Sequence, residues 1–117
     1  MPSFGATGAI YGDLISLAPS AARTTTGNGS NLQNIAYTTF RLTLDVTAAS
    51  GTTPTLDVTL QTSSDGATWA TVGTFAQKIA VSSERKAFSG LDRFVRVIWT
   101  IAGTTPSFTF SVNGEAI

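Results

Sequence analysis

The sequence contains no cysteine and no histidine, and each absence removes a class of chemistry. Without cysteine the chain can form neither a disulfide framework nor a thiol nucleophile, and without histidine it cannot build a Ser-His-Asp triad or a typical zinc site. It also lacks a Gly-rich phosphate loop, a cluster of metal ligands and a nucleophile elbow. We therefore expect that the protein is not an enzyme and that it uses no cofactor, metal or small-molecule substrate.

Charge is scarce as well. Seven basic residues balance seven acidic ones, and charged residues make up only 12% of the chain, against about 25% in typical soluble domains. A neutral chain lacks the electrostatic footprint of a protein that binds nucleic acid or an anionic membrane. The small basic cluster formed by Arg85, Lys86, Arg93 and Arg96 is therefore expected to be a solvated edge or part of a salt bridge between subunits.

Long apolar runs are also missing. The most apolar stretch near the start, residues 9–18, is interrupted by Gly12, Asp13 and Ser16, and the first basic residue of the chain is Arg23. A membrane span needs about 20 mainly apolar residues in succession, and an export signal begins with a basic region. The sequence therefore predicts a protein that is made in the cytoplasm and has no membrane segment.

Hydroxyl groups are abundant. The chain has 20 Thr and 12 Ser, together about a quarter of its 117 residues, and it has no long amphipathic helical run. Thr is β-branched and suits the half-buried surface of a pleated sheet. The length suits one domain, since compact domains most often have about 100–150 residues. We expect a single all-β domain whose hydroxyl-rich surface is desolvated against a partner at little cost.

Apolar and polar residues alternate over residues 40–47, 56–61 and 108–112. Such alternation is typical of antiparallel strands with one buried face and one solvated face. Residues 93–101 carry apolar side chains on both faces, which predicts a strand that is central or covered on both sides.

Shorter strands are expected at residues 68–75, with a bulge near Gly73, at 79–81 and at 84–88. Asp65-Gly66, between two of these runs, is a strong hairpin signal.

A Gly-Thr-Thr-Pro motif occurs at residues 51–54 and again at 103–106, 52 residues later. We expect residues 49–54 to form a hairpin loop between the strands on either side, with Pro54 opening the second strand, where no ladder donor is needed. The repetition indicates two equivalent hairpins in a two-sheet sandwich. Either an internal duplication or convergence of two hairpins on the same loop explains it.

These patterns together predict an antiparallel β-sandwich of about seven or eight strands, immunoglobulin-like or jelly-roll-like, over residues 31–117. Its expected core consists of Phe40, Leu42, Leu44, Leu56, Val58, Trp69, Val95, Val97, Trp99, Phe108 and Phe110.

Residues 1–30 differ in texture, being rich in Gly and polar residues with no sustained period. We interpret them as an N-terminal arm, with one strand near residues 23–26; residues 10–11 and 14–17 are also able to pair as brief strands. The arm is too apolar for a free tail, so its side chains pack either on the protein's own sandwich or on a neighbour, and of these we expect a neighbouring subunit or a larger particle. Its expected contact residues are Phe4, Ile10, Tyr11, Leu14, Ile15 and Leu17.

The outward face of the strand at 93–101 is expected to add Phe94, Arg96 and Ile98 to these contacts. Surfaces of this kind favour a symmetric homo-oligomer, a dimer or a trimer.

Two groups of residues invite a functional interpretation. Asp45 and Asp57 flank the first Gly-Thr-Thr-Pro motif and are expected on neighbouring strands, where they are most simply solvated charges. The Ser63–Trp69 turn is similar to turns of carbohydrate-binding β-sandwich modules, which leaves sugar binding as an alternative; the simpler interpretation is an Asx turn with an aromatic residue beneath it.

Several motifs occur in order between residues 40 and 112: residues 42–47, 50–58, 64–69, 93–97 and 103–108. In this arrangement the chain resembles small structural proteins of tailed-bacteriophage virions. The resemblance implies a non-enzymatic virion protein, most simply a head decoration (cement) protein on the major capsid protein. A neck or tail subunit is the alternative, and no catalytic residue is carried over.

Overall fold

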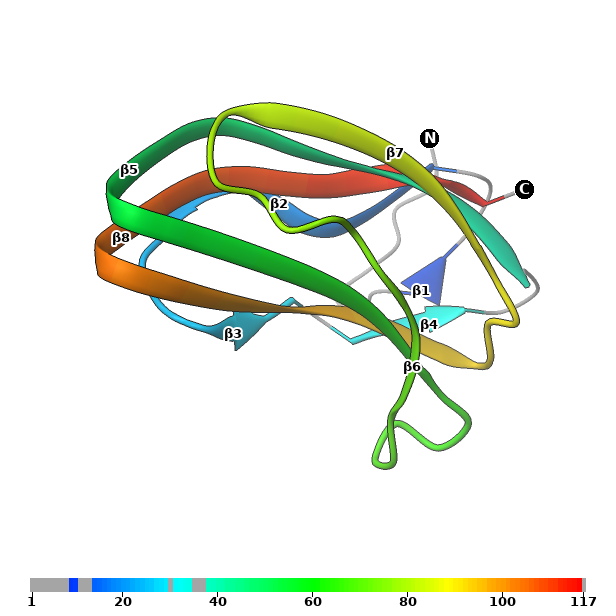
Figure 1. Ribbon diagram of the computed structural model, residues 1–117. Helices are drawn as coiled ribbons and strands as arrows, with labels where there is room; N and C mark the ends of the chain where they lie inside the picture. Colours follow the sequence, from blue (N-terminus) through cyan, green and yellow to red (C-terminus); the bar gives the residue numbers. More distant parts are fainter. Residues whose placement is uncertain (1–8, 11–13, 30, 35–37, 117) are drawn as a thin grey trace.

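The computed structural model describes residues 9–10, 14–29, 31–34 and 38–116, and in these ranges all regular secondary structure is β (Figure 1). One sheet contains all eight strands, which are β1 (Ala9–Ile10), β2 (Leu14–Arg23), β3 (Gly27–Asn28), β4 (Leu32–Asn34), β5 (Thr39–Ser63), β6 (Ala70–Thr74), β7 (Ser82–Ser89) and β8 (Phe94–Ala116). Every pairing is antiparallel except the short parallel pairing of β1 with β4. The predicted all-β class and strand number are confirmed.

The two long strands β5 and β8 form the frame of the molecule. They pair along their whole length, from Phe40 opposite Ala116 to Ser63 opposite Phe94. Both bend sharply near their middle, so that the sheet folds back on itself into two layers (Figure 1). A single continuous sheet thereby becomes a sandwich.

Each layer contains one half of β5 and one half of β8. In the first layer β2 and β7 flank residues 39–50 of β5 and 107–116 of β8. In the second layer β3, β4 and β6 flank residues 55–63 of β5 and 94–102 of β8. Strand β8 is therefore central in both layers, as the two apolar faces of residues 93–101 indicate.

The two Gly-Thr-Thr-Pro motifs form the bend, and the expected hairpins there are wrong. Residues 49–54 do not form a hairpin, because the two halves of β5 pair with β8 and not with each other; they continue β5 around a corner beside the matching corner of β8, and Pro54 lies inside β5 at a shift of register. The corners pack closely: a Cβ on Gly51 would lie 2.7 Å from the Thr105 carbonyl oxygen, and one on Gly103 would lie 2.9 Å from Pro54 Cα. Each glycine is therefore required by its opposite corner.

The backbone of the two corners is nearly identical. Gly51 and Gly103 have φ angles of 112° and 120°, and Thr53 and Thr105 have φ angles of 47° and 46°. Left-handed threonines are costly because their branched Cβ crowds the backbone. In each corner the threonine hydroxyl donates a 2.8 Å hydrogen bond to the preceding carbonyl.

The core fills the space between the layers. All but one of the eleven predicted core residues are buried; the exception is Trp69, which is only partly buried. The structure adds Phe75 and Leu91 from the connections, Phe88 from β7, and Ile15 and Leu17 from β2. The alternation of β5 and β8 therefore predicts their buried faces correctly.

The connection from β6 to β7 passes from the second layer to the first. The predicted bulge near Gly73 is confirmed, because the β5–β6 register skips Val72. β7 covers the strand predicted at 84–88. No strand forms at 79–81, where the only ladder contact is the isolated bridge between Lys78 and Leu56.

The described part of the predicted arm belongs to the sandwich. β2 and β3, residues 14–28, pair with β8 across both layers, and their path follows the bend beside it (Figure 1). Ile15 and Leu17, expected to contact a neighbour, are 6% and 1% exposed in the chain's own core. The expectation that these two side chains contact a neighbour is therefore wrong. The described part of the arm is also not separated from the sandwich at the expected boundary after residue 30.

Positively charged side chains close both open sides of the sandwich. Between β2 and the core, Arg23 donates to the carbonyl oxygens of Phe110 at 2.7 Å and Pro19 at 2.6 Å. Its guanidinium also lies 4.7 Å from the centre of the Trp99 ring and 4.4 Å from that of Phe110. One arginine thus joins an aromatic residue of each layer.

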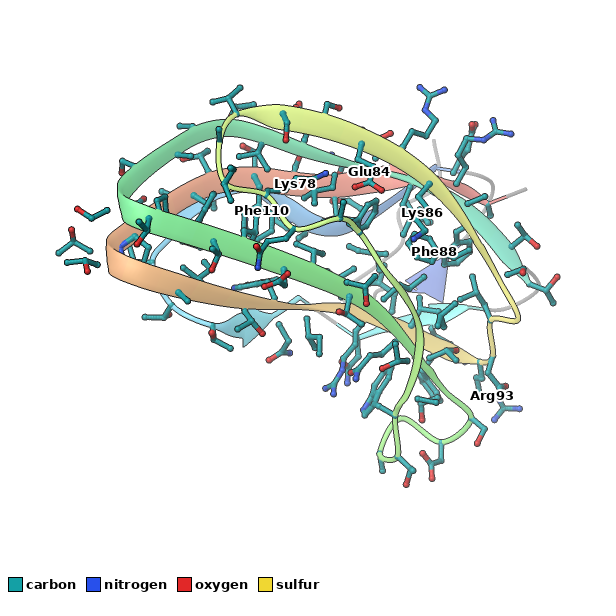
Figure 2. All side chains as sticks on the ribbon, in the orientation of Figure 1. Lys78, Glu84, Lys86, Phe88, Arg93 and Phe110 are labelled. Carbon is teal, nitrogen blue, oxygen red and sulfur yellow. The ribbon has the colours of Figure 1, made fainter. Side chains whose placement is uncertain are left out.

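On the opposite side Lys86 of β7 donates a 2.7 Å hydrogen bond to the Thr74 carbonyl oxygen of β6. Figure 2 shows Lys86 beside Phe88, whose ring makes an edge contact with Phe75 at 5.3 Å. A lysine and an aromatic pair therefore join the layers at this side.

The corner can be tested by adding one methyl group. Gly103→Ala should lower the free energy of unfolding by about 1–3 kcal/mol more than Gly90→Ala does. Gly90 is the matched control, because its φ is also positive, at 76°, while nothing lies within 4 Å of its Cβ position. If urea unfolding gave the same loss of unfolding free energy for both variants, the packing of the corners would not contribute to stability.

The placement of β2 can be tested by limited proteolysis. Arg23 is the first tryptic site in the chain, and its side chain is held by carbonyl oxygens of β2 and β8. Under native conditions trypsin should leave the bond after Arg23 intact, as read by mass spectrometry. Rapid loss of the first 23 residues from the free protein would contradict the cis packing of β2.

Candidate interaction surfaces

The structure divides the predicted contact residues into three groups. Phe4 and Tyr11 lie outside the described residues, and Ile10 and Leu14 lie in β1 and β2 with side chains outside the description. Ile15 and Leu17 are in the core, as shown above. Only Phe94, Arg96 and Ile98 lie on an outer face, that of the second layer, and all three are partly buried.

Residues 63–69, the turn loop, cover part of this outer face. A Cβ on Gly66 would lie 3.7 Å from the ring of Phe94, and the indole of Trp69 lies 4.3 Å from the Arg96 guanidinium. Arg96 also donates a 2.9 Å hydrogen bond from Nε to Gln61 Oε1. The turn loop of the same chain thus covers part of the apolar outer face of β8.

The turn loop is held by hydrogen bonds to Asp65. One carboxylate oxygen accepts from the backbone N–H groups of Ala67 and Thr68 at 2.8 and 2.9 Å and from the Ser63 hydroxyl at 2.9 Å. These bonds, led by the one from the Thr68 amide, lower the pKa of Asp65 to about 2. A depressed pKa stabilises the fold above the ordinary carboxyl pKa, and the effect is lost as the pH falls toward 2. The predicted Asx turn is confirmed.

Trp69 is the predicted core residue that is not in the core. It is the last residue of the turn loop, just ahead of β6, and its ring stacks on Arg96 instead of facing the opposite layer. Tryptophan and arginine are both enriched in protein interfaces, because each side chain combines apolar area with a polar group. We name Trp69, Phe94, Arg96 and Ile98 the outer-face cluster.

A second surface lies on the crossing segment, residues 75–81, which connects β6 to β7. Ile79 is 66% exposed and Val81 is 62% exposed, and no other large apolar side chain of the described residues is comparably exposed. Beside Ile79 a hollow of about 350 Å³ is lined by Thr53, Pro54 and Thr55 of the β5 corner. The segment therefore presents an apolar projection next to a mainly apolar depression.

The crossing segment is fixed by three backbone hydrogen bonds to β5, each 2.9 Å long. They run from Phe75 N to Val58 O, from Lys78 N to Leu56 O and from Leu56 N to Lys78 O. The exposure of Ile79 is thus imposed by the backbone of its neighbours.

A nearly buried ion pair adds a second anchor. Lys78 Nζ lies 2.7 Å from Glu84 Oε1, which also accepts a 3.0 Å hydrogen bond from the Ala76 amide (Figure 2). Partial burial alone would raise the pKa of Glu84, but the hydrogen bonds from Lys78 and Ala76 and the charges of Lys78 and Lys86 outweigh it, so the pKa is lowered. Glu84 therefore stays ionised and holds Lys78 in place.

The remaining candidates are not brought together. Asp45 lies in the first layer opposite Ser83 and Ser111, whereas Asp57 lies in the second layer opposite Thr100 and accepts from the Gln77 amide at 3.1 Å. The bend of β5 separates them, so the expectation of neighbouring strands is wrong. Within the described ranges, no three His, Cys, Asp or Glu side chains form a group that could hold a metal ion.

The alternation of Ile79 and Val81 predicts a short strand and does not mark them as an exposed surface. The indication of exposure in the sequence is that these two aliphatic side chains lie between polar residues and have no complementary apolar run to pair with.

Comparison of the sequence with models of protein families gives no match, and comparison with curated proteins gives none either. The part of the chain that the structure describes has no helix long and apolar enough to cross a membrane.

The different roles of the two tryptophans predict different costs of truncation. Trp99→Ala should lower the free energy of unfolding by about 3–5 kcal/mol, because a large side chain leaves the core. Trp69→Ala should cost about 1 kcal/mol, mainly the lost contact with Arg96. Chemical denaturation measures both, and a Trp69 variant as unstable as the Trp99 variant would place Trp69 in the core after all.

Proposed function

We propose that this protein is a non-enzymatic structural subunit of a tailed-bacteriophage virion, and that it decorates the head by binding the major capsid protein. The phage context comes from the resemblance of residues 40–112 to small virion proteins. The observation that carries the docking role is the exposed pair Ile79 and Val81 beside the corner hollow. It is an apolar contact site on an otherwise hydroxyl-rich molecule without net charge.

The surroundings of this site suit a protein partner. The charged groups next to it are already engaged, Lys78 with Glu84 and Asp57 with Gln77, so docking need not strip water from an unpaired charge. Thr53 and Thr55 of the corner place polar groups beside the apolar centre, and protein interfaces usually combine an apolar centre with polar surroundings. Because the crossing segment is anchored to β5, little conformational freedom is lost on binding.

A neck or tail position is the second candidate, since such subunits are also small β domains. Sugar binding is the third, and the outer-face cluster is the feature that favours it. Trp69 keeps part of its ring accessible beside the polar Gln61 and Arg96. A glycan array with the wild type and Trp69→Ala separates this function from a structural one.

Copy number in purified particles tests the proposal. Quantitative gel analysis should find hundreds of copies per particle if the protein decorates the head, because a capsid lattice offers many equivalent sites. Six or twelve copies would reject head decoration in favour of the neck or tail tip, and intermediate multiples of six would indicate the tail tube.

The same particles test the docking surface. Ile79→Ser with Val81→Ser should fold normally, because both side chains are exposed, and should fail to rebind particles stripped of the protein. Thr100→Ser, a conservative change at an exposed position on the other long strand, is the control and should rebind fully. Full rebinding of the double variant would exclude this surface.

A further inference from the structure

The outer face of the first layer carries a polar hollow of about 300 Å³. It is lined by Arg41 and Thr43 of β5, Arg85 of β7, and Asn113, Gly114 and Glu115 of β8. In the sheet register Thr43 stands between Arg85 and Asn113, and Arg41 stands between Ala87 and Glu115. The two arginines are therefore diagonal neighbours on one face, roughly 7–8 Å apart at their backbones.

The hollow has one more cation than its own acid can neutralise. Arg41 is paired with Glu115 at 3.3 Å, and both side chains remain more than 40% exposed, at 44% and 41%. Arg85 makes no hydrogen bond or ion pair with any residue that the structure describes. Asp45, the next acid along this face, stands opposite Ser83 and is not within ion-pair distance of Arg85.

Four of the side chains around the hollow can donate hydrogen bonds. Two guanidinium groups, the Asn113 amide and the Thr43 hydroxyl all face one space. Guanidinium groups bind carboxylates with two parallel hydrogen bonds, and this geometry is stronger than a contact between neutral groups. Glu115, bonded to Arg41, limits the orientations of that guanidinium.

We propose that this hollow, the arginine hollow, binds a carboxylate group on an acidic segment of a partner protein. One spare positive charge suits a single carboxylate. A nucleic acid would bring a row of phosphates to a face that also carries Glu115 and Asp45, so like charges would oppose it. The hollow shares no lining residue with the corner hollow beside Ile79 and is thus a second contact site, beyond the proposed docking surface.

Titration of the isolated protein with a short acidic peptide tests this inference. The probe is acetyl-Gly-Glu-Glu-Gly-amide at low salt, followed by the backbone amide signals of Asn113 and Gly114 and the side-chain Nε–H signal of Arg85. These signals should shift together and saturate. Arg85→Gln should weaken binding about tenfold, because it removes the unpaired guanidinium.

Arg93→Gln is the matched control. It removes the same charge from an exposed arginine that stands just before β8 and does not line the hollow; Figure 2 labels its side chain. It should bind the peptide like the wild type, and the Gln-for-Glu peptide should not bind. Equal weakening in both variants, or no shift at millimolar peptide, overturns the site.

Two further probes distinguish the ligand. Inorganic phosphate or a single-stranded oligonucleotide that shifts the same signals at lower concentration than the peptide would overturn the carboxylate assignment. Because the test uses the isolated chain, its result does not depend on the copy number in particles. A copy number that rejects head decoration does not reject the arginine hollow, and failure to bind the peptide does not reject head decoration.

Discussion

Close contact between the two Gly-Thr-Thr-Pro corners is the constraint on which the rest of this structure depends. Each corner places a backbone carbonyl and a proline where the other corner has no side chain, so Gly51 and Gly103 are needed as a pair. The contact lets β5 and β8 turn together without breaking their ladder. Because both strands turn at the same place, every strand that pairs with them is assigned to one of two layers, and the buried faces of all strands meet in one core.

A sandwich made from one folded sheet leaves two sides open, and the sequence closes them with its few cations. Arg23 closes one side over Trp99 and Phe110, while Lys86 and the Lys78–Glu84 pair close the other. In each case the charged head is satisfied by carbonyl or carboxylate oxygens, and the aliphatic stem covers apolar surface. Three of the seven basic residues are thus structural, and few remain for binding. Arg85, which has no partner among the described residues, is one that remains available.

Strand faces could be predicted from the sequence because alternation is a local property. Phe40, Leu42, Val95 and Phe110 are buried as their spacing indicates. The corner could not be told from a hairpin loop, because both place Gly-Thr-Thr-Pro between two alternating runs. The two differ in strand pairing: in a hairpin the runs pair with each other, whereas here each run of β5 pairs with β8.

Two further misplacements come from interruptions of the ladder. β2 shifts register near Ala18, which removes the alternation that would have revealed its full length beyond residues 14–17. Trp69 stands beyond the Asp65 turn, so its direction is not fixed by the spacing of β5. Of the candidate surfaces, Phe94, Arg96 and Ile98 followed from alternation in β8. The exposure of Ile79 depends instead on hydrogen bonds to β5, and the sequence of the crossing segment does not contain them.

The pairing of β5 with β8 also has a consequence for the time course of folding. Its closest partners, Ser63 and Phe94, are 31 residues apart, and its most distant, Phe40 and Ala116, are 76 apart. Among the described strands only the β5–β6 hairpin is local. Most of the ladder must therefore wait for long loops to close, and domains of this kind fold on the order of milliseconds to seconds. Until the corners meet, the apolar faces of two long and nearly uncharged strands are exposed to other chains, and self-association competes with folding.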